Sequence, residues 1–259
     1  MIVKHYQIKR LGRFFCIIEV EVFNMCGRFT VTVSYQELEE HLKEYYDIHE
    51  LPLFDVPRYN IAPGQNIISI LNDGSKHRVG YLKWGFIPPF SKDESVGFQM
   101  INAKAETIFD KVSFKDSAIH KRCVILADSF YEWKKDDKGK TPHRIYLKNE
   151  KLFSFAGLWT TYQKSDGTKV HTATILTTEP NELMSSIHFR MPVILNKEDE
   201  KIWLNPRIKD KNTLLKVLKA YPSELMSADI VSNYVNQAKN DSIECIQPIQ
   251  IKGKQELFD

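Results

Sequence analysis

Alternation of hydrophobic and polar positions dominates the middle of the chain and predicts mostly antiparallel β structure. Residues 66–71 and 77–84 are rich in β-forming residues, and Asn72-Asp73-Gly74-Ser75 between them favours a tight turn. These two runs therefore predict a hairpin. Turn-forming residues separate further runs that predict strands at residues 28–33, 123–131, 143–147, 152–159 and 169–177.

Helical spacing appears on either side of this β-rich region. Ser34-Tyr35-Gln36-Glu37 has the form of a capping box and predicts a helix over residues 35–47. Two more helices are expected at residues 196–204, with an asparagine N-cap, and at residues 212–220. No linker or internal repeat divides the chain, so we predict a single α+β domain with a largely antiparallel, barrel-like β core flanked by helices.

Composition adds little to this picture. The chain has 259 residues, of which 42% are hydrophobic, and a formal net charge of +3. A chain of this length can bury a sizeable core, but so small a charge neither supports nor excludes binding to nucleic acid, which would need a local basic patch. The apolar run at residues 14–23 is too short to span a bilayer and lacks an export cleavage site, so we expect a cytoplasmic protein without a membrane segment.

The four cysteines are scattered and suggest reactivity rather than a metal centre. Cys16, Cys26, Cys123 and Cys245 form no CxxC pair and have no histidine at zinc-ligand spacing. A structural metal is therefore not expected, and the sequence implies no organic cofactor. The cysteines fit a reduced, cytosolic protein.

Cys26 follows Met25 directly, as the second residue of a protein follows its initiator methionine. Once Met25 is removed, Cys26 has a free α-amine beside its thiol, and such a 1,2-aminothiol captures aldehydes as a thiazolidine. This chemistry requires either translation from Met25 or removal of the first 25 residues. The alternative is a buried hydrophobic cysteine, the commoner fate of an isolated one.

The first 24 residues allow two interpretations. They are an N-terminal extension that comes from a misassigned start or serves as a propeptide, since Val20-Glu21-Val22 can be encoded by a purine-rich stretch just before Met25. Alternatively, residues 15–23 form a genuine added strand, because they are rich in β-branched side chains. We favour the extension, followed by one domain over residues 25–251 and a disordered tail at residues 252–259.

Several motifs in one order resemble a known family, the SOS response-associated peptidase (SRAP) family of abasic-site processing proteins. The resemblance runs from Met25 to about Pro248, and it implies a protein that crosslinks itself to abasic sites in single-stranded DNA and shields them. The motifs are Met25-Cys26-Gly27-Arg28-Phe29, Tyr59-Asn60-Ile61-Ala62-Pro63, Trp84-Gly85-Phe86-Ile87-Pro88, Asn102-Ala103-Lys104-Ala105-Glu106-Thr107, Phe130-Tyr131-Glu132-Trp133 and His188-Phe189-Arg190-Met191-Pro192.

The resemblance assigns catalytic roles to four residues. Cys26 is the aminothiol, His188 assists opening of the sugar ring, and Glu132 moves protons at the amine, although the last two roles could be exchanged. Asn102 orients the aminothiol and the sugar through an amide that both donates and accepts. Without the resemblance, Glu132 would be an exposed strand-end carboxylate, His188 a core or loop histidine, and Asn102 a turn residue.

The same resemblance implies a binding track for single-stranded DNA, made of cations for phosphates and of apolar faces for bases. Two departures are visible: Lys104 replaces the usual arginine and loses its bidentate fork, and Phe189 replaces an aspartate. We expect weaker binding and a local packing change. A tryptophan in a β-rich domain is, however, more often part of the core. The expected DNA-binding residues are Arg28, Pro63, Trp84, Lys104, Trp133, Thr177 and Arg190.

Two other classes of function stay open. In one, Cys26 is an N-terminal nucleophile that cleaves off its own propeptide, with Glu132 or His188 as the base. In the other, the protein only binds single-stranded DNA and needs no cysteine. Weak strand cleavage by β-elimination from a Schiff base is a plausible side activity. We expect a monomer that acts near the replication fork, where replication proteins could recruit it.

Overall fold

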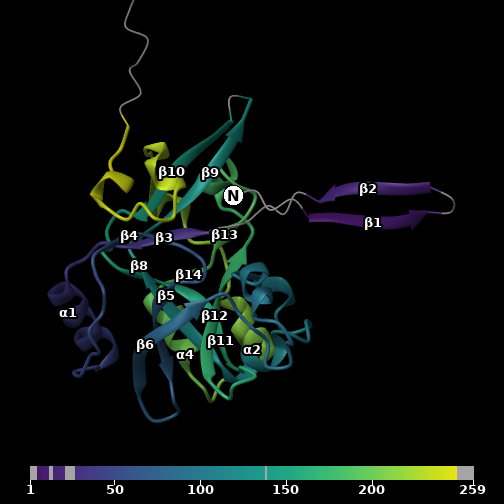
Figure 1. The fold of residues 1–259 in the computed structure, drawn as a ribbon. Coiled ribbons are helices and arrows are strands. Elements are labelled where there is room, and N and C mark those ends of the chain that lie inside the picture. The colour runs from purple at the N-terminus through teal and green to yellow at the C-terminus, as the bar shows by residue number, and fades with distance from the viewer. Residues whose placement is uncertain (1–4, 12–13, 21–26, 138, 250–259) are drawn as a thin grey trace, which may run out of the picture.

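A computed structural model describes residues 5–11, 14–20, 27–137 and 139–249 of the chain. Cys26 and the predicted tail at residues 252–259 lie outside these ranges. Residues 5–11 and 14–20 are described by their backbone pairing alone: β1 (His5–Leu11) and β2 (Phe14–Val20) form a separate antiparallel sheet (Figure 1). The alternative strand at residues 15–23 thus corresponds in part to β2.

Five strands close into a barrel in the order β12, β6, β5, β8, β11 and back to β12. The contact between β6 and β12 is parallel, and the other four are antiparallel. This arrangement confirms the predicted α+β class with a largely antiparallel, barrel-like core. The barrel strands are β5 (Asn66–Asn72), β6 (His77–Trp84), β8 (Arg122–Ala127), β11 (Phe153–Gln163) and β12 (Lys169–Thr178).

Three short strands extend the barrel sheet at its margins. β7 (Asn102–Lys104) runs parallel to β12, whereas β13 (Met191–Pro192) and β14 (Ile194–Leu195) lie antiparallel to β12 and β11. A second sheet covers one end of the barrel in the order β15, β10, β9, β3, β4. Its strands are β3 (Arg28–Val31), β4 (Arg58–Ile61), β9 (Ser129–Asp136), β10 (Gly139–Leu147) and β15 (Met226–Ile230).

Helices flank the barrel and close the connections. Helix α1 begins after the predicted capping box, in which Ser34 and Glu37 bond each other's backbone amides, so that prediction is confirmed. The α-helices are α1 (Tyr35–Tyr46), α2 (Lys115–His120), α3 (Glu182–Ser185), α4 (Lys197–Leu204) and α5 (Lys211–Lys216). The 3₁₀ helices are η1 (Glu94–Gln99), η2 (Ala105–Thr107), η3 (Ser223–Leu225), η4 (Asn233–Asn236) and η5 (Ile243–Cys245).

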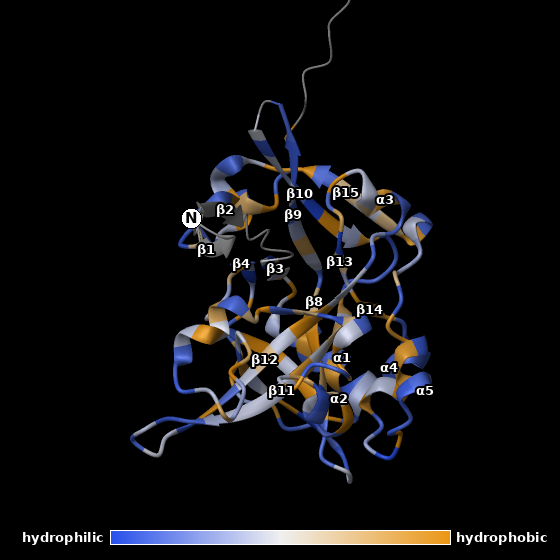
Figure 2. Ribbon diagram, turned by 90° about the vertical axis from the view of Figure 1, so that its right-hand side faces the viewer, coloured by the Kyte–Doolittle hydropathy of each residue, from blue (hydrophilic) through white to orange (hydrophobic). Residues whose placement is uncertain are grey.

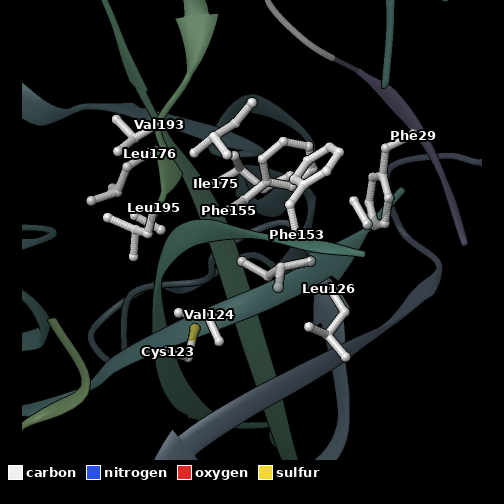
Figure 3. Close-up of a cluster of buried hydrophobic side chains, with 14 of the residues drawn as sticks. Phe29, Cys123, Val124, Leu126, Phe153, Phe155, Ile175, Leu176, Val193 and Leu195 are labelled. Carbon is white, nitrogen blue, oxygen red and sulfur yellow. The ribbon is translucent and has the colours of Figure 1, made fainter. Parts of the chain in front are cut away.

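The main core fills the barrel and the space beneath the second sheet. Phe29 from β3 meets Phe155 from β11 edge to face, with ring centroids 5.8 Å apart. Leucine, isoleucine and valine side chains from β8 and β12 complete this cluster (Figure 3). The barrel strands are correspondingly hydrophobic, whereas the far end of the β9–β10 hairpin is hydrophilic (Figure 2). This core fixes the second sheet on the barrel.

Two predicted elements differ from the structure. The run at residues 123–131 is two strands, because Asp128 ends β8 and β9 continues in the other sheet. The Asp128 carboxylate accepts bonds from the Thr32 hydroxyl at 2.6 Å and from the Thr30 hydroxyl, which holds the chain as it changes sheets. Helix α5 ends at Lys216 rather than at residue 220. Among the described residues, no helix is long and apolar enough to cross a membrane.

Candidate functional site

Glu132 lies on β9, which pairs with β3, the strand that begins one residue after Gly27. It is 2% exposed. Strands β3 and β9 pair with Arg28 opposite Tyr131, so the next step of the register brings Gly27 opposite Glu132. The residue that follows Cys26 and the predicted acid–base carboxylate are therefore neighbours across the sheet.

Asn102 reaches the same region from the barrel. It begins β7, which pairs with Ile175 of β12. Its chain neighbour Ile101 approaches Gly27: a Cβ added to that glycine would lie 4.0 Å from Ile101 Cδ1. Asn102, Gly27 and Glu132 thus come together although they are far apart in the sequence.

Trp84 holds this junction from inside the core. Its indole N–H donates to the Ile101 carbonyl oxygen at 2.9 Å, and the side chain is 1% exposed. The prediction that the Trp84 ring offers a face to DNA bases is therefore wrong. The ring instead supports the segment that ends in Asn102, because a buried indole needs a partner for its single donor.

His188 lies in the loop after α3 and is partly buried. Its Nδ1 is 3.2 Å from the Arg190 amide, which donates to a deprotonated Nδ1, and 3.1 Å from the Arg190 carbonyl, which accepts from a protonated one. The ring stacks on Phe189 with centroids 4.5 Å apart. Burial lowers the pKa of His188, the charge of Lys140 lowers it further, and the Arg190 carbonyl opposes both. The neutral ring is favoured near pH 7.

Arg190 and Lys104 form a cationic cluster beside this loop. Arg190 donates two bonds of 2.8 Å to the carboxylate of Glu106 and one of 2.7 Å to the Thr177 carbonyl. Burial alone would raise the pKa of Glu106, but the bonds from Arg190, a backbone hydrogen bond and the charges of Arg190 and Lys104 together outweigh it, so the net shift is downward. Thr177 also pairs with Lys104, which is exposed. Arg190 is thus fixed in place, and Lys104 faces solvent.

Two buried polar atoms in this cluster have no hydrogen-bond partner among the described residues. They are Thr177 Oγ1 and Arg190 Nε. Both atoms are withdrawn from solvent, where an unsatisfied donor or acceptor costs free energy. The Thr177 side chain is 0% exposed, so the prediction that it contacts a phosphate is wrong for the same reason as for Trp84.

The remaining predicted residues lie at the edges of this region. Pro63 is partly exposed in the loop after β4. Trp133 is half-buried and donates from its indole to Asn236 Oδ1 at 2.7 Å. Arg28 projects from the face of β3 opposite to Gly27, because side chains alternate along a strand. Arg28 and Trp133 therefore do not share the face of the sheet that carries Glu132.

Sequence reasoning missed two exposed aromatic residues, of which Phe98 lies beside Gly64, the chain neighbour of Pro63. Phe98 of η1 is 62% exposed, and a Cβ at Gly64 would lie 3.0 Å from its ring. Phe90, in the loop after β6, is 64% exposed. Isolated aromatic residues within a polar loop were the available signal, and they offer the apolar faces that Trp84 does not.

The site combines groups from both sheets at one end of the barrel. A buried carboxylate and a neutral histidine suit proton transfer, and fixed cations beside them suit an anionic ligand. Among the described residues, no cluster of three or more histidine, cysteine, aspartate or glutamate side chains could hold a metal ion. The fold and the site thus define a class of barrel protein with acid–base groups beside an anion-binding surface.

Comparison with known proteins identifies the family. The SOS response associated peptidase (SRAP) family matches residues 25–238, and the chain belongs to this family. The abasic site processing protein YoqW of Bacillus subtilis (strain 168) is 49% identical over 225 residues, which cover 86% of this chain and 99% of YoqW. The match starts at residue 25, whereas the division into residues 1–24, 25–251 and 252–259 stays a prediction.

More distant relatives carry the same description. The abasic site processing protein HMCES of Gallus gallus is 30% identical over 234 residues, covering 78% of this chain and 69% of HMCES. The abasic site processing protein YedK of Escherichia coli (strain K12) is 28% identical over 230 residues, covering 87% and 100%. A crystal structure of a protein from Bacteroides thetaiotaomicron superimposes with a TM-score of 0.76 at 26% identity, covering 86% and 100%.

Proposed function

We propose that this protein captures abasic sites in single-stranded DNA as a covalent thiazolidine through Cys26. One observation carries the proposal: Gly27, Glu132 and Asn102 meet at one end of the barrel. Cys26 directly precedes Gly27 in the chain, and consecutive Cα atoms are about 3.8 Å apart. The names of the relatives YoqW, HMCES and YedK, each an abasic site processing protein, support the same substrate.

The chemistry needs two steps at Cys26. The free α-amine attacks the aldehyde carbon of the opened sugar, forms a C=N bond and releases water. The thiol sulfur then attacks the same carbon, the C=N electron pair moves to nitrogen, and the thiol proton ends on that nitrogen. An α-amine has a pKa of about 7.7 to 8.0, so a useful fraction is already nucleophilic near neutrality.

Glu132 and His188 supply the proton transfers that this sequence requires. His188, neutral because of its lowered pKa, takes a proton as the sugar ring opens, and Glu132 carries protons at the amine. If the two roles are exchanged, Glu132 acts at the sugar and His188 acts at the amine. Asn102 orients the reactants through its amide.

The cationic cluster is proposed to hold the DNA backbone next to the lesion. Lys104, which is exposed, and the terminal nitrogens of Arg190 bind phosphate oxygens. Pro63, Phe90 and Phe98 offer apolar faces to bases. Lys104 gives a point charge instead of a bidentate fork, which predicts weaker binding with intact chemistry.

The same proposal includes a setting for the activity. We expect a monomer that acts in the cytoplasm on DNA exposed at replication forks, with replication proteins as partners. Strand cleavage by β-elimination from the Schiff base competes with thiazolidine closure and is expected to be weak.

A second candidate function is autoproteolysis, in which Cys26 cleaves the bond before itself. It is favoured by one observation: β1 and β2 pair only with each other among the described strands. Their removal would break no strand pairing with the barrel, and it would generate the amine that crosslinking needs. If full-length protein shortens by itself and Cys26→Ala does not, this activity exists.

Intact mass spectrometry tests the main proposal. Proteins that start at Met1 and at Met25 are incubated with single-stranded DNA containing one abasic site, and with DNA whose abasic aldehyde has been reduced to an alcohol. We expect the Met25 protein to lose its methionine and to gain the mass of the abasic DNA minus water. Cys26→Ala and the reduced DNA should give no adduct. If no adduct forms when Cys26 is the verified N-terminus, the covalent mechanism is wrong.

A further inference from the structure

The two faces of the second sheet serve different purposes. Side chains alternate along β3 and β9, so Phe29 and Glu132 face the barrel while Arg28 and Tyr131 face away from it. Tyr131 packs on the far face with a small cluster that includes Val235 and Cys245. Arg28 therefore points away from the face on which Glu132 and Gly27 meet.

On the far face, Arg28 is bound to a segment some two hundred residues away in the chain. Residues 231–248, which we call the C-terminal strap, cross this face after β15. The Arg28 guanidinium donates to Val235 O at 2.8 Å and to Asn236 O at 3.2 Å, and its plane lies 6.0 Å from the centre of the Trp133 ring. Burial lowers the pKa of Arg28, as expected for a guanidinium withdrawn from water.

Asn60 joins Arg28 to the strap. Its side chain is fully buried, and its Oδ1 accepts a 2.9 Å bond from Arg28. Its amide nitrogen lies 3.1 Å from Val235 O, 3.1 Å from Gln237 O and 2.7 Å from Asn240 O. One asparagine thus satisfies both the arginine and several backbone carbonyls that would otherwise be buried without a donor.

Asp241 of the strap binds β4. Its carboxylate accepts from the backbone amides of Tyr59 at 2.5 Å and Asn60 at 2.9 Å, and from the Arg58 side chain. Strand β4, which carries these residues, pairs directly with β3. The strap therefore binds β4 through Asp241 and β3 through Arg28.

We propose that Arg28 and Asn60 are positioning residues that clamp the C-terminal strap against β3 and thereby fix the backbone at Gly27, the residue that follows Cys26 in the chain. Arg28 consequently makes no phosphate contact, unlike the role that the sequence suggests for it. The Arg28 side chain is partly buried, and its two terminal nitrogens already donate to the Asn60 amide oxygen and to two strap carbonyls, so a phosphate that took these donors would leave those acceptors without a partner. This inference rests on the proposed function, since it concerns the aminothiol of the same site.

Fixing this backbone matters because a covalent step depends on near-attack geometry. Misplacement of a reacting group by about 1 Å can cost roughly a hundredfold in rate. Loss of the clamp should therefore slow thiazolidine formation while the affinity for DNA stays the same. Loss of a phosphate contact would instead weaken DNA binding and leave the rate of thiazolidine formation at saturating DNA unchanged.

Salt-dependent binding separates these two roles. We measure affinity for single-stranded DNA with a reduced abasic site, which cannot crosslink, over a range of salt concentrations. Removal of one phosphate contact lowers the slope of log K against log salt by about 0.7 for single strands. We expect that loss for Lys104→Gln, and an unchanged slope for Arg28→Gln and for the exposed-surface control Lys209→Gln. A loss of about 0.7 in Arg28→Gln would overturn the proposal.

Crosslinking rates with saturating abasic DNA give the second readout. Arg28→Lys keeps the charge but cannot serve several acceptors at fixed positions, so we expect its rate to fall by about tenfold or more. Asp241→Asn, which touches none of the proposed DNA-binding residues, should slow the reaction in the same direction with the salt slope unchanged. A wild-type rate in Arg28→Lys would contradict the clamp.

Hydrogen exchange tests the clamp without any DNA. In Arg28→Gln and Asn60→Ser, the strap amides of Val235 and Asn240 should exchange at least about tenfold faster than in wild type, while amides of β8 keep their protection. Unchanged protection in the strap would overturn the proposal. If wild-type protein forms no adduct but the strap loses protection in the variants, the proposed function fails and the clamp stands.

Discussion

Arg122 shows how this fold accommodates a buried charge without a carboxylate. The guanidinium at the start of β8 donates to five carbonyl oxygens, and it lies 5.6 Å from the centre of the Trp203 ring. Burial lowers its pKa to about 10, so it stays charged at neutral pH. The five acceptors, at 2.6 to 3.1 Å, are the carbonyls of Ala118, Ile119, Trp203, Asn205 and Ile208.

His41 on α1 gives a prediction about stability at low pH. Its ring packs on Tyr45 and Tyr46, its Nε2 is buried without a partner among the described residues, and burial and the charge of Lys197 lower its pKa to about 4. In the unfolded chain the His41 ring is protonated below about pH 6.5, whereas in the folded protein it stays neutral down to about pH 4. The stability that the neutral ring contributes is therefore complete above pH 6.5 and is lost as the pH falls towards 4. We expect a loss on the order of 2 kcal/mol across this window.

Urea unfolding at several pH values measures this loss. His41→Phe keeps an aromatic ring and removes the titration, so its free energy of unfolding should fall less than that of wild type between about pH 6.5 and 4. Exposed Glu37, whose pKa is lowered from 4.5 to about 2 mainly by its bond with Lys151, also starts to lose its contribution near pH 4.5, but this loss is common to both proteins and cancels in their difference. Parallel pH dependence in the two proteins would show that His41 is not responsible.

Residue-scale prediction from the sequence was weakest for burial. Glu132 and Asn102 come near Gly27, and their catalytic roles stay predictions, but Trp84 supports the segment that ends in Asn102 from within the core. A tryptophan has the same composition signal whether it stacks on a ligand or fills a core. Only the packing around the ring separates the two.

At the scale of elements, local signals predicted local structure well. The capping box gave the start of α1 and the Asp-Gly turn gave the β5–β6 hairpin, because both are set by neighbouring residues. The break between β8 and β9 was missed, because the polar pair Asp128-Ser129 inside an apolar run does not by itself indicate a change of sheet. Asp128, whose partners Thr30 and Thr32 lie on β3, makes that break.

Gly157 on β11 gives a prediction about packing between strands. A Cβ there would lie 2.3 Å from Ile125 Cδ1, 3.1 Å from Cys123 Sγ and 3.1 Å from Thr174 O. Gly157→Ala should therefore lower the free energy of unfolding by about 1 to 3 kcal/mol through overpacking. Ile125→Val removes the methyl group in closest contact, so the double variant should be less destabilised than the sum of the two single variants.

Urea unfolding of the four proteins in this cycle gives the coupling energy. Gly80→Ala on β6 is the matched control, because a Cβ at Gly80 would meet nothing within 4 Å. It should change the free energy of unfolding by no more than about 0.5 kcal/mol. Additive effects of Gly157→Ala and Ile125→Val would mean that the contact with Cδ1 does not limit this position.

At the scale of the whole molecule, the class of fold was predictable and the convergence of the site was not. Strand-rich runs without a linker gave a single antiparallel α+β core. The parallel pairing of β6 and β7 with β12 joins segments whose sequences carry no mutual signal. The strap shows this best, because nothing in residues 231–248 indicates that they bind Arg28.

Long-range assembly also makes one part of the molecule tune another. Lys140, on the β9–β10 hairpin, lowers the pKa of His188 from a different sheet. Lys140→Gln removes that repulsion, so the pKa of His188 should rise towards its ordinary value.

If neutral His188 is the base for ring opening, the crosslinking rate rises with pH through this pKa, and in the variant that rise must occur at higher pH. Rates at saturating abasic DNA, measured between about pH 5 and 8 together with an NMR titration of the ring, should show the variant slower at the acid end and equal to wild type at the alkaline end. Lys134→Gln, on the same hairpin, is the control and should leave both curves in place. A crosslinking profile that stays fixed while the His188 titration moves would assign ring opening to another group, with Glu132 as the first candidate.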